Sequence, residues 1–537
     1  MKTPARPNIV LILADDMGFS DIGCYGGEVR TLNLDTLGRN GVRFSHFYNT
    51  ARCSPSRASL LTGLHPHQTG IGVLTTDDRP HGYAGNLNHH CATLAEILRD
   101  SGYATCLSGK WHLASSRHTP TDAWPTRRGF DQFFGTLTGC GSFYEPGTLT
   151  RGETNASAEA DAPDFFYTDA IAKEATQFIA DHAAPDAPPF FLYAAFTAPH
   201  WPLHAHQQDV ESYNGVFDAG WDKLRVERMR RLIAEGVLPP ETNLSDRDPT
   251  QPPWTEAQHH NWELRRMQVY AAMIERMDRG IGQILAALRQ SGRLDNTFLI
   301  FLSDNGASSE VLPLIEPERF RQRTDIVPRT GKTGQPLRIG NTPDVVPGPD
   351  DTYASYGQAW ANLSNTPFRF YKRWVHEGGI ATPLILHWPA GGLSPGAIVD
   401  QAFQLVDIVP TIIEATGASY PPQSITWNVE PLEGRSMLPA TRGEALDPVP
   451  LFWEHTGNAA IRSGKWKLVR EYPHAWELYD LQTDRTELND LAARHPQIVA
   501  DLSARWQEWA DRVGVLPWET TLRIYQERGL GPIDAAG

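Results

Sequence analysis

The chain has 537 residues, of which 40% are hydrophobic and 21% are charged. This composition excludes a disordered or fibrous chain and fits a folded enzyme that buries a large core, divided into two domains. The formal net charge of −15 argues against nucleic-acid binding and against anionic membrane surfaces, so any anionic ligand has to be attracted by a local pocket.

The first residues include basic side chains, but the apolar run at 9–14 is too short for the core of a signal peptide and leads directly into two aspartates. No later window reaches the length of a membrane span. The five cysteines are scattered without paired spacing, which predicts neither a disulfide framework nor a zinc knuckle. We therefore expect a cytoplasmic protein with no membrane contact.

Short apolar runs of strand type alternate with helical patterns through most of the chain. The predicted strands are 8–13, 103–107, 190–196, 297–302 and 384–387. The predicted helices are 93–102, which opens with a capping-box pattern, 168–182 and 267–288. This alternation predicts an α/β fold with a large mixed, mostly parallel sheet sandwiched by helices.

Three long stretches rich in Pro, Gly, Asp and Thr interrupt the pattern at 114–165, 203–260 and 308–365, and we expect them to be loops that shape a substrate pocket. Beyond residue 440 the pattern changes to short strand-like runs followed by a helix at 496–513. The predicted domains are a catalytic α/β domain at 1–440 and a smaller C-terminal antiparallel α+β domain at 441–537.

Polar side chains follow four of the predicted strands at the points where the strands end. In chain order they are Asp15 and Asp16, then Lys110 and His112, then His200, and then Asp304 and Asn305. Ligands of an open parallel sheet bind in the crevice outside the carboxyl ends of its strands. We therefore expect all these groups to face one place.

Four of these residues, Asp15, Asp16, Asp304 and Asn305, offer only oxygen ligands. Such a set suits a hard divalent cation and does not suit zinc. Three carboxylates in one cleft would also repel one another strongly without a cation. We expect one Ca²⁺ per chain, in preference to Mg²⁺ or Mn²⁺.

The segment Cys53-Ser54-Pro55-Ser56-Arg57, followed by Ala-Ser-Leu-Leu-Thr-Gly at 58–63, places a cysteine and an arginine at the start of a helix. A thiol in that position lies in a positive field, which suits an anionic nucleophile and an anionic substrate. Taken alone, so short a motif fits a buried cysteine in a strand-to-helix turn equally well.

Cys-x-Pro-x-Arg with a following Leu-Thr-Gly resembles the sulfatase signature, in which the cysteine is converted to formylglycine. The resemblance continues in an ordered set over most of the chain: Asp15-Asp16, Lys110-x-His112, His200, Asp304-Asn305, Lys372 with Glu377-Gly378-Gly379, and the C-terminal strings at 464–468 and 478–481. The chain is thus similar to the sulfatases of the alkaline phosphatase superfamily, and most similar to soluble bacterial arylsulfatases.

The resemblance implies hydrolysis of sulfate monoesters, with aryl sulfates as the expected substrates, and a formylglycine-generating maturation enzyme as a partner. Cys53, as formylglycine hydrate, would bind the metal and attack sulfur, and Asp304 would take its proton. His112 would accept the second proton when sulfate leaves. The remaining implied roles are donors to the sulfate for Arg57, Lys110 and Lys372, and stabilisation of the leaving group for His200.

Two other functions remain open at this point. One is a phosphonate or phosphate monoester hydrolase of the same superfamily, although such relatives tend to carry His where this chain has Asn305. The other is a binding protein without catalysis on the same scaffold. A binding protein without catalysis would have lost polar residues of the site, whereas every expected polar position of this chain is filled.

Overall fold

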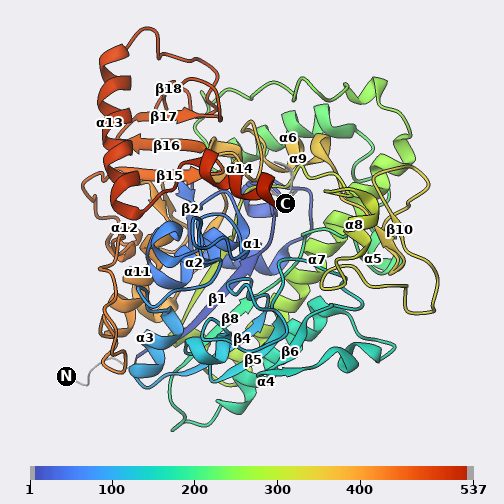
Figure 1. The fold of residues 1–537 in the computed structure, drawn as a ribbon, viewed down its shortest axis with the longest axis vertical. Coiled ribbons are helices and arrows are strands. Elements are labelled where there is room, and N and C mark those ends of the chain that lie inside the picture. Colours follow the sequence, from blue (N-terminus) through green and yellow to red (C-terminus); the bar gives the residue numbers. More distant parts are fainter. Residues whose placement is uncertain (1–5, 529–537) are drawn as a thin grey trace.

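The computed structural model describes residues 6–528. These residues contain a ten-stranded sheet of order β13-β2-β12-β9-β1-β8-β4-β5-β6-β7 (Figure 1). The strands are β1 (Asn8–Ala14), β2 (Val42–Phe44), β4 (Ala104–Gly109), β5 (Gln132–Thr136), β6 (Leu149–Arg151), β7 (Thr154–Asn155), β8 (Phe190–Ala195), β9 (Thr297–Ser303), β12 (Leu384–His387) and β13 (Ile398–Val399). The central run from β9 to β5 is parallel, and β12 pairs antiparallel with both β9 and β2. The predicted fold class is confirmed.

Both faces of this sheet are covered, as the nearly continuous apolar strands predict. Along β1, Val10 and Ile12 pack into one hydrophobic cluster, whereas Ile9, Leu11 and Leu13 pack into a second cluster on the opposite face. The first cluster includes α4 (Tyr167–Asp181) and α7 (His260–Gln290), and the second includes α2 (Cys53–Thr62), α3 (Leu94–Asp100) and α11 (Ile408–Thr416). Helices therefore bury the sheet from both sides.

The predicted strands and helices of the α/β region are all present, with bounds shifted by a few residues. At the start of α3, the Thr93 hydroxyl accepts from the Glu96 backbone N–H at 3.1 Å, and the Glu96 carboxylate accepts from the Thr93 N–H at 2.6 Å. This is the reciprocal pattern of a capping box. Among the helices of residues 6–528, none combines the length and the apolar character needed to cross a bilayer.

The prediction of three structureless loops is wrong in part, because each of them contains regular elements. The additional elements are β5 to β7 in the first, α5 (Gln207–Glu211) and α6 (Gly220–Ala234) in the second, and α8 (Pro317–Arg321), β10 (Arg338–Ile339), β11 (Thr352–Tyr353) and α9 (Gln358–Ser364) in the third. Helix α6 buries Arg225 and Arg228, and Arg228 pairs with Asp21 at 2.8 Å. Inward-facing arginines interrupt the apolar period that would have revealed this helix.

Shorter elements complete the described chain. They are α1 (Leu32–Asn40), β3 (Phe47–Tyr48), α10 (Glu377–Ile380), β14 (Phe403–Gln404) and α12 (Leu438–Thr441). Strands β3 and β14 form a small parallel pair, as do β10 and β11.

The C-terminal region forms its own antiparallel sheet of β15 (Leu451–His455), β16 (Asn458–Ser463), β17 (Trp466–Arg470) and β18 (Glu477–Asp480). Helix α13 (Pro496–Val513) packs against it, and the two lie together at the upper left of Figure 1. Helix α14 (Trp518–Glu527) packs instead near Val73 of the larger region. The antiparallel C-terminal sheet is confirmed, and the domain boundary at 440/441 stays a prediction.

A buried charge network joins the C-terminal sheet to helix α10. Lys467 in β17 is fully buried, and its Nζ lies 2.9 Å from a Glu377 carboxylate oxygen and 2.8 Å from a Glu487 carboxylate oxygen. Arg485 approaches Glu377 at 3.5 Å. Glu377 begins α10, five residues after Lys372, so the C-terminal sheet supports the segment that carries Lys372.

We expect Lys467→Met to lower the free energy of unfolding by about 3–5 kcal/mol, because it leaves two buried carboxylates without their shared cation. The matched control is Lys465→Met, since Lys465 pairs with Asp480 at 2.6 Å but has a side chain that is 47% exposed. That exposed pair should contribute at most about 1 kcal/mol. Urea unfolding of both variants measures the difference, and equal losses would contradict the structural role of the network.

Candidate active site

The site begins where β1 and β9 end side by side. Ala14 and Ser303 are register partners, so Asp15 and Asp16 leave β1 next to Asp304 and Asn305. Asp16 has a left-handed backbone with φ of 68°, and its N–H donates to Asp304 Oδ1 at 3.2 Å. Asn305 Nδ2 donates to Asp16 Oδ1 at 2.6 Å. Asp16 therefore contacts both Asp304 and Asn305 at this edge, directly after Asp15 in the chain.

The neighbouring strands and helix α2 bring positive charge to these carboxylates. Lys110, just after β4, places Nζ 2.6 Å from Asp15 Oδ2. Arg57 in α2 places Nη2 3.0 Å from Asp304 Oδ2 and 3.6 Å from Asp15 Oδ2. All four side chains are fully buried, so each cation offsets a carboxylate that has lost its hydration.

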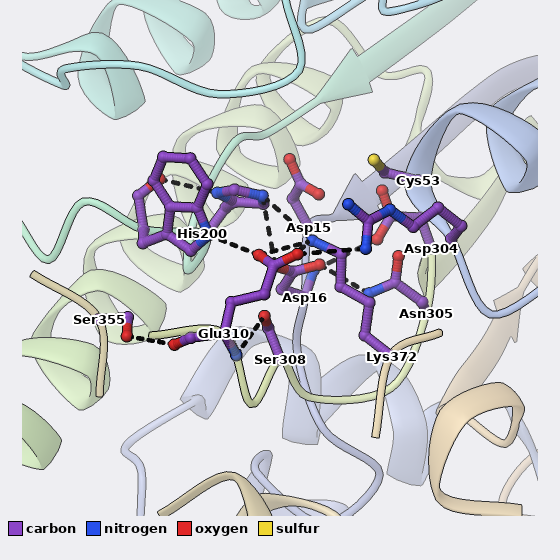
Figure 2. Close-up of polar contacts among 12 residues, drawn as sticks. Asp15, Asp16, Cys53, His200, Asp304, Asn305, Ser308, Glu310, Ser355 and Lys372 are labelled. Atoms are coloured by element: carbon purple, nitrogen blue, oxygen red, sulfur yellow. Dashed lines mark hydrogen bonds and ion pairs between the residues drawn. The ribbon is translucent and has the colours of Figure 1, made fainter. Parts of the chain in front are cut away.

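Two further residues, Lys372 and His200, lie beside Asp16. Lys372 Nζ lies 2.9 Å from Asp16 Oδ2 and 3.3 Å from His200 Nε2. His200 Nε2 in turn lies 3.4 Å from Asp16 Oδ2. Figure 2 shows Asp15, Asp16, His200 and Lys372 converging on one space.

Cys53 is the first residue of α2, and its Sγ lies 3.5 Å from His112 Nδ1. Cys53, His112, His200 and Lys372 all line the same cavity. The structure thus brings every predicted site residue to one place. Their individual roles stay predictions.

The two histidines are neutral bases in this environment. Burial lowers the pKa of His112 well below its usual value, and the nearby charges of Lys110 and Arg57 lower it further. Burial also lowers the pKa of His200 to about 4, although Asp16 opposes the shift. His200 Nδ1 lies 2.7 Å from the Trp201 carbonyl and donates to it, which leaves Nε2 as the acceptor facing Lys372.

Burial and the neighbouring charges shift the pKa values of two of these carboxylates in opposite directions. Burial raises the pKa of Asp304 to about 7 and the neighbouring Asp15 adds to the rise, against the effect of Arg57 and Lys110. For Asp16, the effect of burial is outweighed by Lys372 and His200, and its pKa is lowered. A further cation beside Asp304 would favour its ionised form.

The donor atoms fit a divalent cation. Asp15 Oδ1 and Asn305 Oδ1 are buried and have no hydrogen-bond partner among residues 6–528. Asp15, Asp16 and His200 also present ligand atoms within 4.8 Å of one another. Carboxylate and amide oxygens in this number are the ligands of a hard cation, and one imidazole nitrogen at the edge does not change that preference.

Glu310 and Arg52 belong to the site but were not predicted as site residues. Glu310 Oε1 lies 3.1 Å from Arg52, and Oε2 accepts from the Trp201 indole at 2.6 Å and lies 3.3 Å from Lys372 Nζ. Burial would raise the pKa of Glu310, but Lys372 and Arg52 outweigh it and hold that pKa well below its usual range. No motif marks Glu310 within its long segment, and only the fold shows the partner of Arg52.

The cavity above these groups has a volume of about 220 Å³. Its lining combines the polar side chains of Cys53, His112 and Lys372 with the aromatic side chains of Trp201 and Phe320. Such a combination suits a ligand with one charged end and an apolar body.

Comparison with known proteins agrees with this geometry. The sulfatase family model matches residues 7–418, and a model for the C-terminal part of N-sulphoglucosamine sulphohydrolase matches residues 368–511. The chain belongs to the sulfatase family. Its membership supports the hydrolysis of sulfate esters by this sulfatase.

Several curated relatives of this sulfatase span most of its length. An arylsulfatase of Klebsiella aerogenes is 34% identical over 77% of this chain and 87% of the relative. An uncharacterized sulfatase of Schizosaccharomyces pombe is 32% identical over 95% of this chain and 94% of the relative, and the mouse steryl-sulfatase is 29% identical over 86% and 69%. These names cover more than one sulfatase type, so the family does not settle the substrate.

Solved structures share the fold. A sulfatase from Pseudoalteromonas sp. superposes with a TM-score of 0.62 at 19% identity, covering 95% of this chain and 91% of the other. A protein solved in complex with its substrate D-glucosamine-2-N,6-O-disulfate has a TM-score of 0.62 at 21% identity, covering 95% and 98%.

We expect Ca²⁺ to raise the thermal unfolding temperature of this sulfatase after treatment with a chelator, because the cation relieves the buried carboxylates. At a Ca²⁺ concentration of about one hundred times Kd, the gain in stability should be about 2.7 kcal/mol. Asp15→Asn should remove most of this calcium-dependent gain. The matched control is Asp407→Asn, a buried carboxylate that accepts from two backbone N–H groups outside the site, and it should keep the gain. Loss of the gain in both variants would contradict the assignment.

Proposed function

We propose that this sulfatase hydrolyses aryl sulfate monoesters with a formylglycine made from Cys53 and a bound calcium ion. The observation that carries the proposal is the position of Cys53, which begins α2 on the floor of a small cavity with His112 3.5 Å from its sulfur. The family membership and the 34% identity to an arylsulfatase support it.

The residues around Cys53 fit the modified group. Asp15, Asp16, Asp304 and Asn305 would hold the cation, whose charge would polarise a sulfate oxygen. A formylglycine hydrate at position 53 supplies one hydroxyl that attacks sulfur and a second that allows sulfate to leave as the aldehyde returns. As a neutral imidazole, His112 is able to accept the proton given up at that second hydroxyl.

The cations of the site act on the transferred sulfate and on the leaving oxygen. Lys110 and Arg57 are held rigidly by Asp15 and Asp304, so they need no reorganisation to face an anion. Lys372 donates toward His200 Nε2 at 3.3 Å, which places an ammonium and an imidazole beside each other on the open side of the cavity. The Lys372 ammonium is suited to stabilise and protonate the departing phenolate, and the neutral His200 accepts from Lys372 and orients it.

The size of the cavity favours a small leaving group. Its volume of about 220 Å³ lies below the range of roughly 300–1,000 Å³ that is typical of drug-sized ligand sites. Its lining includes Trp201, Phe320 and Ile326, which suit the faces of a single ring. An aryl ester fits these walls better than a long sugar chain does.

We expect Cys53→Ala to abolish turnover of 4-nitrophenyl sulfate, because alanine cannot form the nucleophile. Mass spectrometry of the peptide that contains residue 53 should show formylglycine when the protein comes from a host with a formylglycine-generating enzyme. The control is Cys24→Ala, a buried cysteine that hydrogen-bonds near α1 and should keep its activity. Full activity with an unmodified thiol at position 53 would sink this mechanism.

A panel of esters tests the substrate class and its main rival. We expect kcat/KM to be higher for 4-nitrophenyl sulfate than for 4-nitrophenyl phosphate, and higher than for a steroid sulfate or a glucosamine 6-sulfate. Each assay is run with Ca²⁺ and with Mn²⁺ after removal of metal. A faster phosphate ester, especially with Mn²⁺, would favour a phosphate monoester hydrolase instead.

A further inference from the structure

The outer wall of the cavity carries positive charge that the reaction centre does not use. Arg117 and Arg323 line the cavity together with the apolar side chains of Leu314, Ile315 and Phe320. Arg117 follows β4 and Arg323 lies just beyond α8, so segments far apart in the chain build this wall.

Two guanidinium groups share a single carboxylate there. Arg117 Nη1 lies 2.9 Å from Asp325 Oδ2, and Arg323 binds the same carboxylate through two contacts of 2.9 Å. The three side chains together carry one excess positive charge. In contrast, the inner cations Lys372 and Arg52 are matched by Asp16 and Glu310.

The environment of Arg117 shows that its charge is incompletely balanced. Its Nε is buried and has no hydrogen-bond partner within the described part of the chain. Burial lowers the pKa of Arg117, Asp325 opposes this effect, and the positive charge of Arg323 lowers the pKa further. Two arginines held together against their own repulsion create a field that an incoming anion would relieve.

The wall belongs to the same cavity as the reaction centre. The charge of Arg117 contributes to the low pKa of His112, which contacts Cys53. The apolar side chains lie in this lining as well, so the body of a leaving group has surface to pack on between the sulfate and the arginines. A substrate with one charge would leave the outer pair unmatched.

We propose that this sulfatase prefers aryl sulfates whose leaving group carries a second anionic group, such as a carboxylate, which Arg323 and Arg117 recognise at the outer wall. The inference rests on the proposed sulfatase activity at Cys53 and names the substrate class of that site. Guanidinium groups bind carboxylates through paired, charge-assisted hydrogen bonds, which makes them suited to this recognition.

The test compares two esters of the same shape, the sulfates of 4-hydroxybenzoate and 4-hydroxybenzamide, together with the two meta isomers. The carboxamide withdraws electrons more strongly than the carboxylate. The phenolate of the amide ester is therefore the better leaving group. We expect the unaltered enzyme nevertheless to show a kcat/KM about tenfold or more higher for a carboxylate ester than for its amide partner, the size of a charge-assisted hydrogen bond. The preference should weaken as salt is added.

Arg323→Gln should bring the ratio of the kcat/KM values for the carboxylate and amide esters close to the ratio that the electronic effects of the two substituents alone produce. Because the electronic difference is the same in every variant, the change in this ratio reports on the arginine. The matched control is Arg338→Gln, since Arg338 pairs with Asp351 at 2.9 Å and has a 45% exposed side chain, against 41% for Arg323, but lies outside the cavity lining. The control should keep the ratio of the unaltered enzyme.

Each result decides the proposal. Equal kcat/KM values for the carboxylate and amide esters in the unaltered enzyme would overturn the inference and leave the aryl sulfatase activity standing. A preference that survives Arg323→Gln, or disappears equally in Arg338→Gln, would also overturn it. Absence of turnover for all these esters, in protein shown to contain formylglycine, would overturn the proposed function and the inference with it.

Discussion

The close approach of three buried carboxylates at the ends of β1 and β9 is the constraint on which the rest of the site depends. Asp15, Asp16 and Asp304 cannot remain ionised together in a dry interior unless positive charge surrounds them. Arg57, Lys110 and Lys372 supply part of that charge, each from a different element. The unpartnered oxygens that remain among the described residues point to a divalent cation.

This balance of charge explains why the C-terminal sheet supports the active site although the sheet lies outside it. Lys372 has to lie beside Asp16, and the chain segment that carries Lys372 leads directly into Glu377. Glu377 is held by Lys467 from the C-terminal sheet, in a network from which water is excluded. A buried ion pair of this kind adds little net stability, but it defines the position of both partners because no other placement satisfies them.

We propose that the cavity divides into a part that performs the chemistry and a part that selects the substrate. The floor is built from residues at strand ends and the start of α2, all buried and rigidly paired. The outer wall comes largely from the long segment after β9, which contributes Leu314, Phe320 and Arg323. Loops on a rigid scaffold vary without disturbing the reaction centre, so we expect this wall to select the substrate of this sulfatase.

The sequence by itself determined the α/β class and the central strands, and it predicted the strand-end residues that meet at the site. These features are local, since buried parallel strands are short apolar runs and polar residues at their ends are adjacent in the chain to the strands that position them. Helix α6 escaped detection because Arg225 and Arg228 turn inward toward partners far away in sequence. Only the tertiary structure decided that Glu310 pairs with Arg52 and Lys372, that Lys467 reaches Glu377, and that Arg117 and Arg323 share Asp325. Some of those contacts join residues that lie far apart in the chain, and the others involve residues in irregular segments. Neither kind leaves a periodic signal in the sequence, so the contacts form only once the chain has folded.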